Sequence, residues 1–173
     1  DEEEKVLREL EEVIRTSRRL HKRSLEELDR VLEESKALHR ESKRALEDVT
    51  REITKLADDR DKKDVVRRLK ELLERILRTD EKIVRDSEEA LKRIEEEDKK
   101  IVRRSEEVLK RVIDKVDVER IRKLVDDLRK ENEKALRESK KRVEEIRRRN
   151  EEAIKDSKKD VEDLERDLER KRK

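Results

Sequence analysis

Apolar and small polar residues recur along this chain at intervals of three and four positions. In the first segment the series begins with Val6, Leu10, Val13 and Ser17, and two later segments carry series with the same spacing. Steps of three and four residues place the members of a series on one face of an α-helix. Disordered chains rich in charge do not carry such a stripe, so the pattern predicts ordered amphipathic helices.

The stripe is interrupted at residues 57–64 and again at 114–117. Asp61 and Asp117 are expected to cap the helices that follow, and Asp64 lies where a carboxylate meets the positive end of a helix. Connections this short make neighbouring helices antiparallel, so the expected fold is an all-α, up-down-up antiparallel bundle of long helices. The predicted helices span about residues 2–58, 62–114 and 118–171.

An 18-residue repeat runs through each predicted helix. Leu10 recurs as Leu28, and Asn132 recurs as Asn150. Eighteen residues make five turns at 3.6 residues per turn, and this period lies between the repeats that wind helices left-handed and right-handed. The three helices are therefore expected to be nearly straight and to form a single three-helix domain, residues 1–173.

The predicted apolar faces also carry serine, histidine, aspartate and asparagine. When the chain is folded at its two connections, these residues come level at two heights, one repeat apart. An unpaired buried polar group costs about 1–3 kcal/mol, so we expect two copies of a hydrogen-bond network, with His21 facing Asp98 and His39 facing Asp80. Polar layer 1 comprises Ser17, His21, Ser24, Asp98, Ser105, Asn132 and Ser139, and polar layer 2 comprises Ser35, His39, Ser42, Asp80, Ser87, Asn150 and Ser157.

Composition excludes several classes of function. Charged residues make up 61% of the chain and hydrophobic residues 29%, while glycine, proline, cysteine, methionine and the aromatic residues are absent. A zinc finger needs cysteine, a phosphate-binding loop needs glycine, and a base-stacking surface needs aromatic side chains. No apolar run approaches the ~18 residues of a membrane span, and the net charge of +2 arises from mixed signs. We therefore expect no cofactor, no metal, and no nucleic-acid, membrane or small-molecule partner.

Serine, histidine and aspartate in one layer are also the residue types of a hydrolase triad. A working triad needs a cleft and an oxyanion hole, and neither is predicted inside a packed bundle, so no catalytic residue is assigned and the chain is not expected to be an enzyme. One histidine and one aspartate per layer are too few to hold a metal ion. Protonation of the histidines as a pH switch remains an alternative, although an aspartate partner favours the charged imidazole in place.

With its repeat, its matched polar layers and its twelve residue types, the chain resembles de novo designed helical bundles with buried hydrogen-bond networks. That family includes designed heterodimers and the cage proteins of latch–cage–key switches. The resemblance covers the whole chain, and the two connections depart from it because they lack glycine, proline and serine. It implies a synthetic protein without a natural activity, which we expect to be soluble and expressed in the cytoplasm. The motifs that carry the resemblance are Ser17/His21/Ser24 with Ser35/His39/Ser42, Asp80/Ser87 with Asp98/Ser105, and Asn132/Ser139 with Asn150/Ser157.

Two functions from different classes are consistent with this pattern. The chain is either a self-sufficient structural scaffold, or an acceptor whose groove binds a fourth amphipathic helix from a latch, key or partner chain; a second copy of the chain would bury the same surface. Three mutually packed helices need apolar stripes of about 100–120° each, and the stripes of the first two predicted helices span about 140°. The candidate groove, formed by this extra apolar surface, comprises Leu7, Ile14, Leu25, Leu32, Leu73, Leu77, Leu91 and Leu109.

Overall fold

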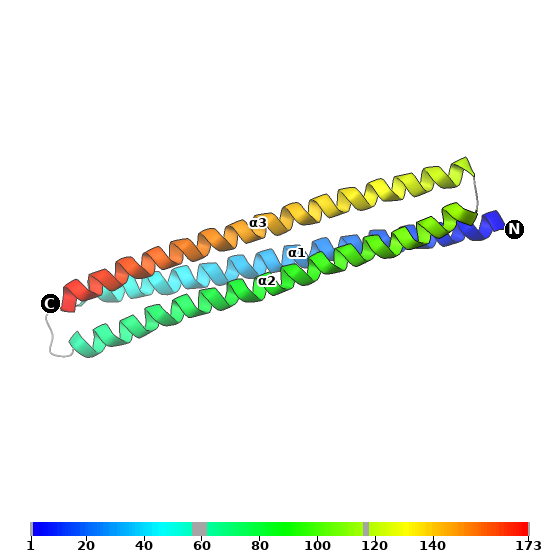
Figure 1. The fold of residues 1–173 in the computed structure, drawn as a ribbon. Coiled ribbons are helices and arrows are strands. Elements are labelled where there is room, and N and C mark those ends of the chain that lie inside the picture. Colours follow the sequence, from blue (N-terminus) through cyan, green and yellow to red (C-terminus); the bar gives the residue numbers. More distant parts are fainter. Residues whose placement is uncertain (1, 57–61, 116–117, 173) are drawn as a thin grey trace. The chain divides into compact units, whose positions relative to one another are not determined.

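Three long α-helices account for nearly all of the chain (Figure 1). The computed structural model describes residues 2–56, 62–115 and 118–172. Within these ranges there is no strand, and the predicted all-α three-helix bundle is confirmed. The helices are α1 (Glu2–Thr54), α2 (Lys62–Lys115) and α3 (Glu119–Arg172).

Helix α1 ends at Thr54, four residues before the predicted boundary at residue 58. The Leu56 N–H donates to the carbonyl of Ile53 at 3.1 Å, a three-residue step that tightens the last turn and stops the regular four-residue ladder. Leu56 is half-buried and packs against the core from outside the helix. The apolar pattern does not distinguish a residue buried by a turn from one buried by a helix. The helix predicted from the sequence therefore extends past Thr54 to include Leu56.

The other helix ends lie within one residue of the prediction. Helix α2 ends at Lys115 and helix α3 begins at Glu119. The Val118 carbonyl accepts from the N–H groups of Ile121 and Arg122 at 3.0 and 3.1 Å, so Val118 occupies the capping position of α3. The predicted caps, Asp61 and Asp117, lie outside the described residues.

The helices pack into two compact units, and each helix contributes a segment to both. Unit 1 comprises Asp1–Val31 with Ala90–Glu145, and unit 2 comprises Leu32–Glu89 with Ile146–Lys173. Polar layer 1 lies entirely in unit 1 and polar layer 2 entirely in unit 2. The single domain expected from the sequence stays a prediction.

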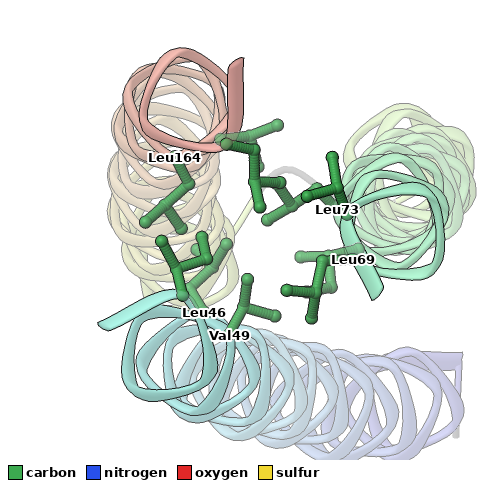
Figure 2. Packing of buried hydrophobic residues seen from close by; sticks show 10 residues of the cluster. Leu46, Val49, Leu69, Leu73 and Leu164 are labelled. Atoms are coloured by element: carbon green, nitrogen blue, oxygen red, sulfur yellow. The ribbon is translucent and has the colours of Figure 1, made fainter. Parts of the chain in front are cut away.

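Each unit has its own apolar core. In unit 2, Leu46 and Val49 of α1, Leu69 and Leu73 of α2 and Leu164 of α3 point toward one another (Figure 2). Full burial of a leucine or valine side chain stabilises a fold by about 1.5–3 kcal/mol, so these clusters supply the main driving force for packing. The core of unit 1 is formed by Val6, Leu10, Leu109, Val112, Ile121, Val125 and Leu128.

The described surface is almost free of apolar protrusions. None of the described large hydrophobic side chains is exposed. In the same residues, no helix combines the length and apolar character needed to cross a bilayer. The charged side chains therefore cover the faces of the helices that do not pack against a neighbour.

Candidate functional site

The residues of the two polar layers lie on the packed faces of the helices. Eleven of these fourteen residues are buried, and His21, His39 and Ser157 are half-buried. Asp80 is the most enclosed, with 0% of its surface exposed, and Asp98 is 3% exposed. Burial of so many polar groups is costly unless they are hydrogen-bonded, so their partners decide what the layers do.

Asn132 joins the three helices in unit 1. Its Nδ2 donates to Ser105 Oγ of α2 at 2.7 Å, and its Oδ1 accepts from His21 Nε2 of α1 at 3.0 Å. Ser139 of α3 donates to Asp98 Oδ2 of α2. A side-chain amide supplies both a donor and an acceptor, which lets one residue of α3 bind a hydroxyl and an imidazole on two different helices.

Asn150 has the same position in unit 2 and makes one more hydrogen bond. Its Nδ2 donates to Ser87 Oγ at 2.9 Å, and its Oδ1 accepts from Ser35 Oγ at 3.0 Å and from His39 Nε2 at 3.3 Å. In the same layer, Ser42 Oγ donates to Asp80 Oδ1. Side chains of all three helices thus converge on one buried amide.

The predicted pairing of histidine with aspartate is wrong. Both imidazoles bind asparagine oxygens instead, and both aspartates accept from serine hydroxyls. In layer 2 the reason is position. The half-buried His39 ring lines the surface hollows between α1 and α3, whereas Asp80 is fully enclosed among the three helices. Matching the heights of residues along the helices did not reveal this lateral separation.

Each buried aspartate keeps one oxygen without a hydrogen-bond partner. These atoms are Asp98 Oδ1 in unit 1 and Asp80 Oδ2 in unit 2. The occupied oxygens differ in their donors, because Asp98 is bound by Ser139 of α3 and Asp80 by Ser42 of α1. An unpaired buried acceptor destabilises a fold, so these two carboxylate oxygens lower the stability of the layers.

Ion pairs flank the two layers and were not anticipated from the sequence. Arg129 Nε donates to the two carboxylate oxygens of Glu106 at 3.1 and 3.2 Å, and Arg147 Nε donates to both oxygens of Glu88 at 3.0 Å. The two pairs are related by the 18-residue repeat, which was the signal that could have revealed them. The hydrogen bond to Glu106 raises the pKa of Arg129 above its already high usual value.

Arg18 of α1 and Glu131 of α3 form a further bidentate pair in unit 1. Arg18 Nη2 donates to Glu131 Oε1 at 2.7 Å and Arg18 Nε to Glu131 Oε2 at 3.0 Å. This hydrogen bonding holds the pKa of the Glu131 carboxyl below its usual value and raises the pKa of Arg18. Both side chains are substantially exposed, so solvent weakens the pair.

The candidate groove is wrong for three of its eight residues. Leu73, Leu91 and Leu109 are 0% exposed and belong to the cores, so they offer no surface to a fourth helix. The extra stripe width in the sequence reflects thick packing among the three helices themselves. Of the remaining residues, Leu7 and Ile14 pack against the unit 1 core, Leu77 packs against the unit 2 core, and Leu25 and Leu32 are half-buried.

In the described residues, the side chains that could bind a metal or act in catalysis do not gather into a metal-binding or catalytic arrangement. Across the described ranges, no group of three or more histidine, cysteine, aspartate or glutamate side chains is placed to hold a metal ion. His21 binds Asn132 while Ser139 binds Asp98, so the serine, histidine and aspartate of unit 1 form two separate hydrogen bonds and not a relay.

Comparisons with known proteins add little to this picture. The chain matches no protein-family model. No curated protein matches it either. A solved structure described as a computationally designed three helix bundle is similar to it, with 22% sequence identity, a TM-score of 0.47, and coverage of 97% of this chain and 81% of that one. A likeness this loose carries no argument about a site or a role.

Proposed function

We propose that this protein is a designed structural scaffold without a natural biochemical activity. Its 18-residue repeat and its twelve residue types support a designed origin. The observation that carries the proposal is the pair of buried asparagines, Asn132 and Asn150, one repeat apart, each hydrogen-bonded to side chains of both other helices. The function of the layers is then to specify one packing arrangement of three otherwise similar amphipathic helices.

The physical basis is a compromise between stability and specificity. Apolar side chains in these positions would pack more favourably, because polar groups lose their hydration on burial. Apolar cores built on a simple repeat, however, tolerate shifted registers and other oligomeric states. A shift of one helix would separate Asn132 from Ser105 and Asn150 from Ser87, leaving buried donors and acceptors without partners.

The test is the solution mass of the protein and of a variant in which all fourteen polar-layer residues are replaced by leucine, valine or alanine. By light scattering we expect a single species of 21.2 kDa for the protein. We expect the variant to stay helical, to resist guanidinium better and to form mixed oligomers. A variant that unfolds, or one that remains a uniform monomer with one set of amide resonances, would overturn this role for the layers.

Absence of catalysis is part of the same proposal. The separate partners of His21 and Asp98 support it, because a general base must reach the nucleophile that it activates. We expect hydrolysis of an activated ester by the protein and by the double variant His21→Ala/His39→Ala to be equal. A turnover that disappears in the double variant would contradict the proposal.

A further inference from the structure

A small hollow lies between α1 and α2 in unit 1. It has a volume of about 210 Å³, and every residue that lines it belongs to that unit. Its wall is mainly apolar and is formed by Val13 and Leu20 of α1 with Ile101 and Val108 of α2. An apolar concavity of this kind shields part of a small molecule from water.

One buried hydroxyl in this hollow has no partner within the described part of the chain. Ser17 lines the hollow and is 4% exposed, yet its Oγ forms no hydrogen bond with a described residue. Its counterpart one repeat later, Ser35, donates to Asn150 Oδ1 at 3.0 Å. In unit 1, Asn132 Oδ1 accepts from His21 and not from Ser17. Because an unpaired buried hydroxyl is costly, a ligand that binds Ser17 gains from its hydrogen bond.

The other polar groups of the hollow already have partners or reach water. Ser105 Oγ donates to a backbone carbonyl at 3.2 Å and accepts from Asn132 Nδ2 at 2.7 Å. Thr16 is half-buried, so water can hydrate its hydroxyl. Glu12 and Arg104 are exposed and have opposite charges, which favours a neutral ligand over either ion. A single hydrogen-bonding group on the ligand therefore matches the hollow.

The volume limits the size of the ligand. An apolar cavity of about 150 Å³ takes up a benzene molecule, whereas pockets for drug-sized ligands have volumes of about 300–1,000 Å³. At about 210 Å³, the hollow between α1 and α2 fits a six-membered ring with one substituent. An α-helix is about 10–12 Å across with its side chains, so a helix is too large to enter.

We propose that this hollow binds a small neutral molecule made of a six-membered carbon ring and one hydroxyl group, the class to which phenol belongs. The ring packs against the apolar wall, and the ligand hydroxyl accepts a hydrogen bond from Ser17 Oγ. This differs from the expectation of no small-molecule partner, which considers residue types and not the space between two packed helices. The site depends on the packing of unit 1 and is independent of the scaffold function.

Phenol is the probe of this site, and benzene is its control because it lacks the hydroxyl. The chain has no phenylalanine, tyrosine or tryptophan, so nuclear magnetic resonance detects the ring protons of a ligand beside those of only two histidines. We expect saturable binding of phenol with a Kd of about 1 mM, as is usual for ligands of this size. Nuclear Overhauser effects should connect its ring protons with the methyl groups of Val13, Leu20, Ile101 and Val108. Binding that does not saturate, or contacts with other methyl groups only, would overturn the proposal.

Ser17→Ala tests the hydrogen bond. It should weaken phenol binding about fivefold, the effect of losing one hydrogen bond, and should not weaken benzene binding. Ser24→Ala is the matched control and should leave phenol binding unchanged, because Ser24 is also a buried serine of α1 in unit 1 but does not line the hollow. Equal weakening of phenol and benzene by Ser17→Ala would show that Ser17 does not bind the ligand hydroxyl. Tighter binding of benzoate than of phenol would assign the hollow to anions and refute the neutral class.

Val13→Phe tests the location, because the larger side chain fills the hollow. Val31 lies one repeat later and is half-buried, as Val13 is, so Val31→Phe is the matched control. Val13→Phe should weaken phenol binding at least about tenfold, whereas Val31→Phe should leave it unchanged. Circular dichroism checks that all variants keep their helices. Full affinity of the Val13→Phe variant for phenol would place the binding site elsewhere on the protein.

Discussion

Replacement of the two buried asparagines by alanine should destabilise the protein unequally. Asn150 is hydrogen-bonded to Ser35, His39 and Ser87, whereas Asn132 is hydrogen-bonded to Ser105 and His21. Both substitutions delete the same atoms from sites of similar burial, 3% and 4% exposed, so the cost of the cavity largely cancels when the two are compared. The difference between them therefore reports on the hydrogen bonds.

The magnitude follows from the hydrogen bonds that each substitution removes. A hydrogen bond contributes about 1 kcal/mol net, and a buried hydroxyl left unpaired adds to the destabilisation. Asn150→Ala removes three hydrogen bonds and leaves the buried hydroxyls of Ser35 and Ser87 without this partner. Asn132→Ala removes two, and the buried Ser105 hydroxyl keeps its hydrogen bond to the Val102 carbonyl. We expect the free energy of unfolding to fall by about 3 and about 2 kcal/mol respectively.

Guanidinium unfolding followed by circular dichroism measures both decreases, with equal slopes required before the midpoints are compared. A double-mutant cycle of Asn150→Ala with Ser35→Ala should give a coupling free energy of about 1 kcal/mol between the two side chains. Hydrogen exchange should show that protection falls first in the unit that carries each substitution. Equal decreases for the two asparagines, or zero coupling between Asn150 and Ser35, would show that these hydrogen bonds do not determine the difference in stability.

Three further predictions concern the ion pair, the aspartates and the core. Because Arg18 lowers the folded-state pKa of Glu131, their pair stabilises the protein above the usual carboxyl pKa, and this contribution is lost as pH falls through the lowered value. Arg18→Ala should abolish that acid dependence. The effect should be below about 1 kcal/mol because the pair is exposed. Guanidinium unfolding midpoints measured over a series of pH values test this. Asp98→Leu with Ser139→Ala should raise the unfolding free energy by about 1–3 kcal/mol, because an unpaired buried acceptor is removed, and a decrease would contradict this. Leu28→Ala should lower it by about 2–5 kcal/mol, since Leu28 is 0% exposed; a decrease below about 1 kcal/mol on the same denaturation curve would count against its place in the core.

The sequence predicts what depends on periodicity. The lengths of the helices and the burial of Asn132 and Asn150 follow from the three- and four-residue steps and the 18-residue repeat. Side-chain partners do not follow, because a height along a helix leaves the lateral direction open. For this reason the sequence predicts that His39 faces Asp80, whereas in the structure His39 binds Asn150. Stripe width likewise does not separate a core residue such as Leu91 from an outward one, since both belong to the same apolar face.

The replacement of the Arg18–Glu131 pair by Lys36 and Arg149 one repeat later can be recognised only once the ion pairs of unit 1 are known. Without the observed Arg18–Glu131 pair, nothing in the sequence identifies Lys36 and Arg149 as facing positions. The repeat then transfers the pairing from one unit to the other. A repeated sequence thus acts as its own reference, because each departure from the repeat marks a position where the two units differ in surface chemistry.

Asn132 and Asn150 are hydrogen-bonded across helices inside the bundle, and the proposed role of the layers depends on these bonds. They are the only side-chain amides of the chain, which contains no glutamine, so nuclear magnetic resonance should show just two side-chain NH₂ groups. The decisive measurement is the rate at which these groups exchange protons with water. We expect the amide proton donated to Ser105 or Ser87 to exchange at least about tenfold more slowly than in an unstructured peptide. Ser105→Ala should accelerate the exchange of the Asn132 amide, and Ser87→Ala that of the Asn150 amide. Exchange of both groups at the rate of an exposed amide would show that neither asparagine is hydrogen-bonded inside the bundle.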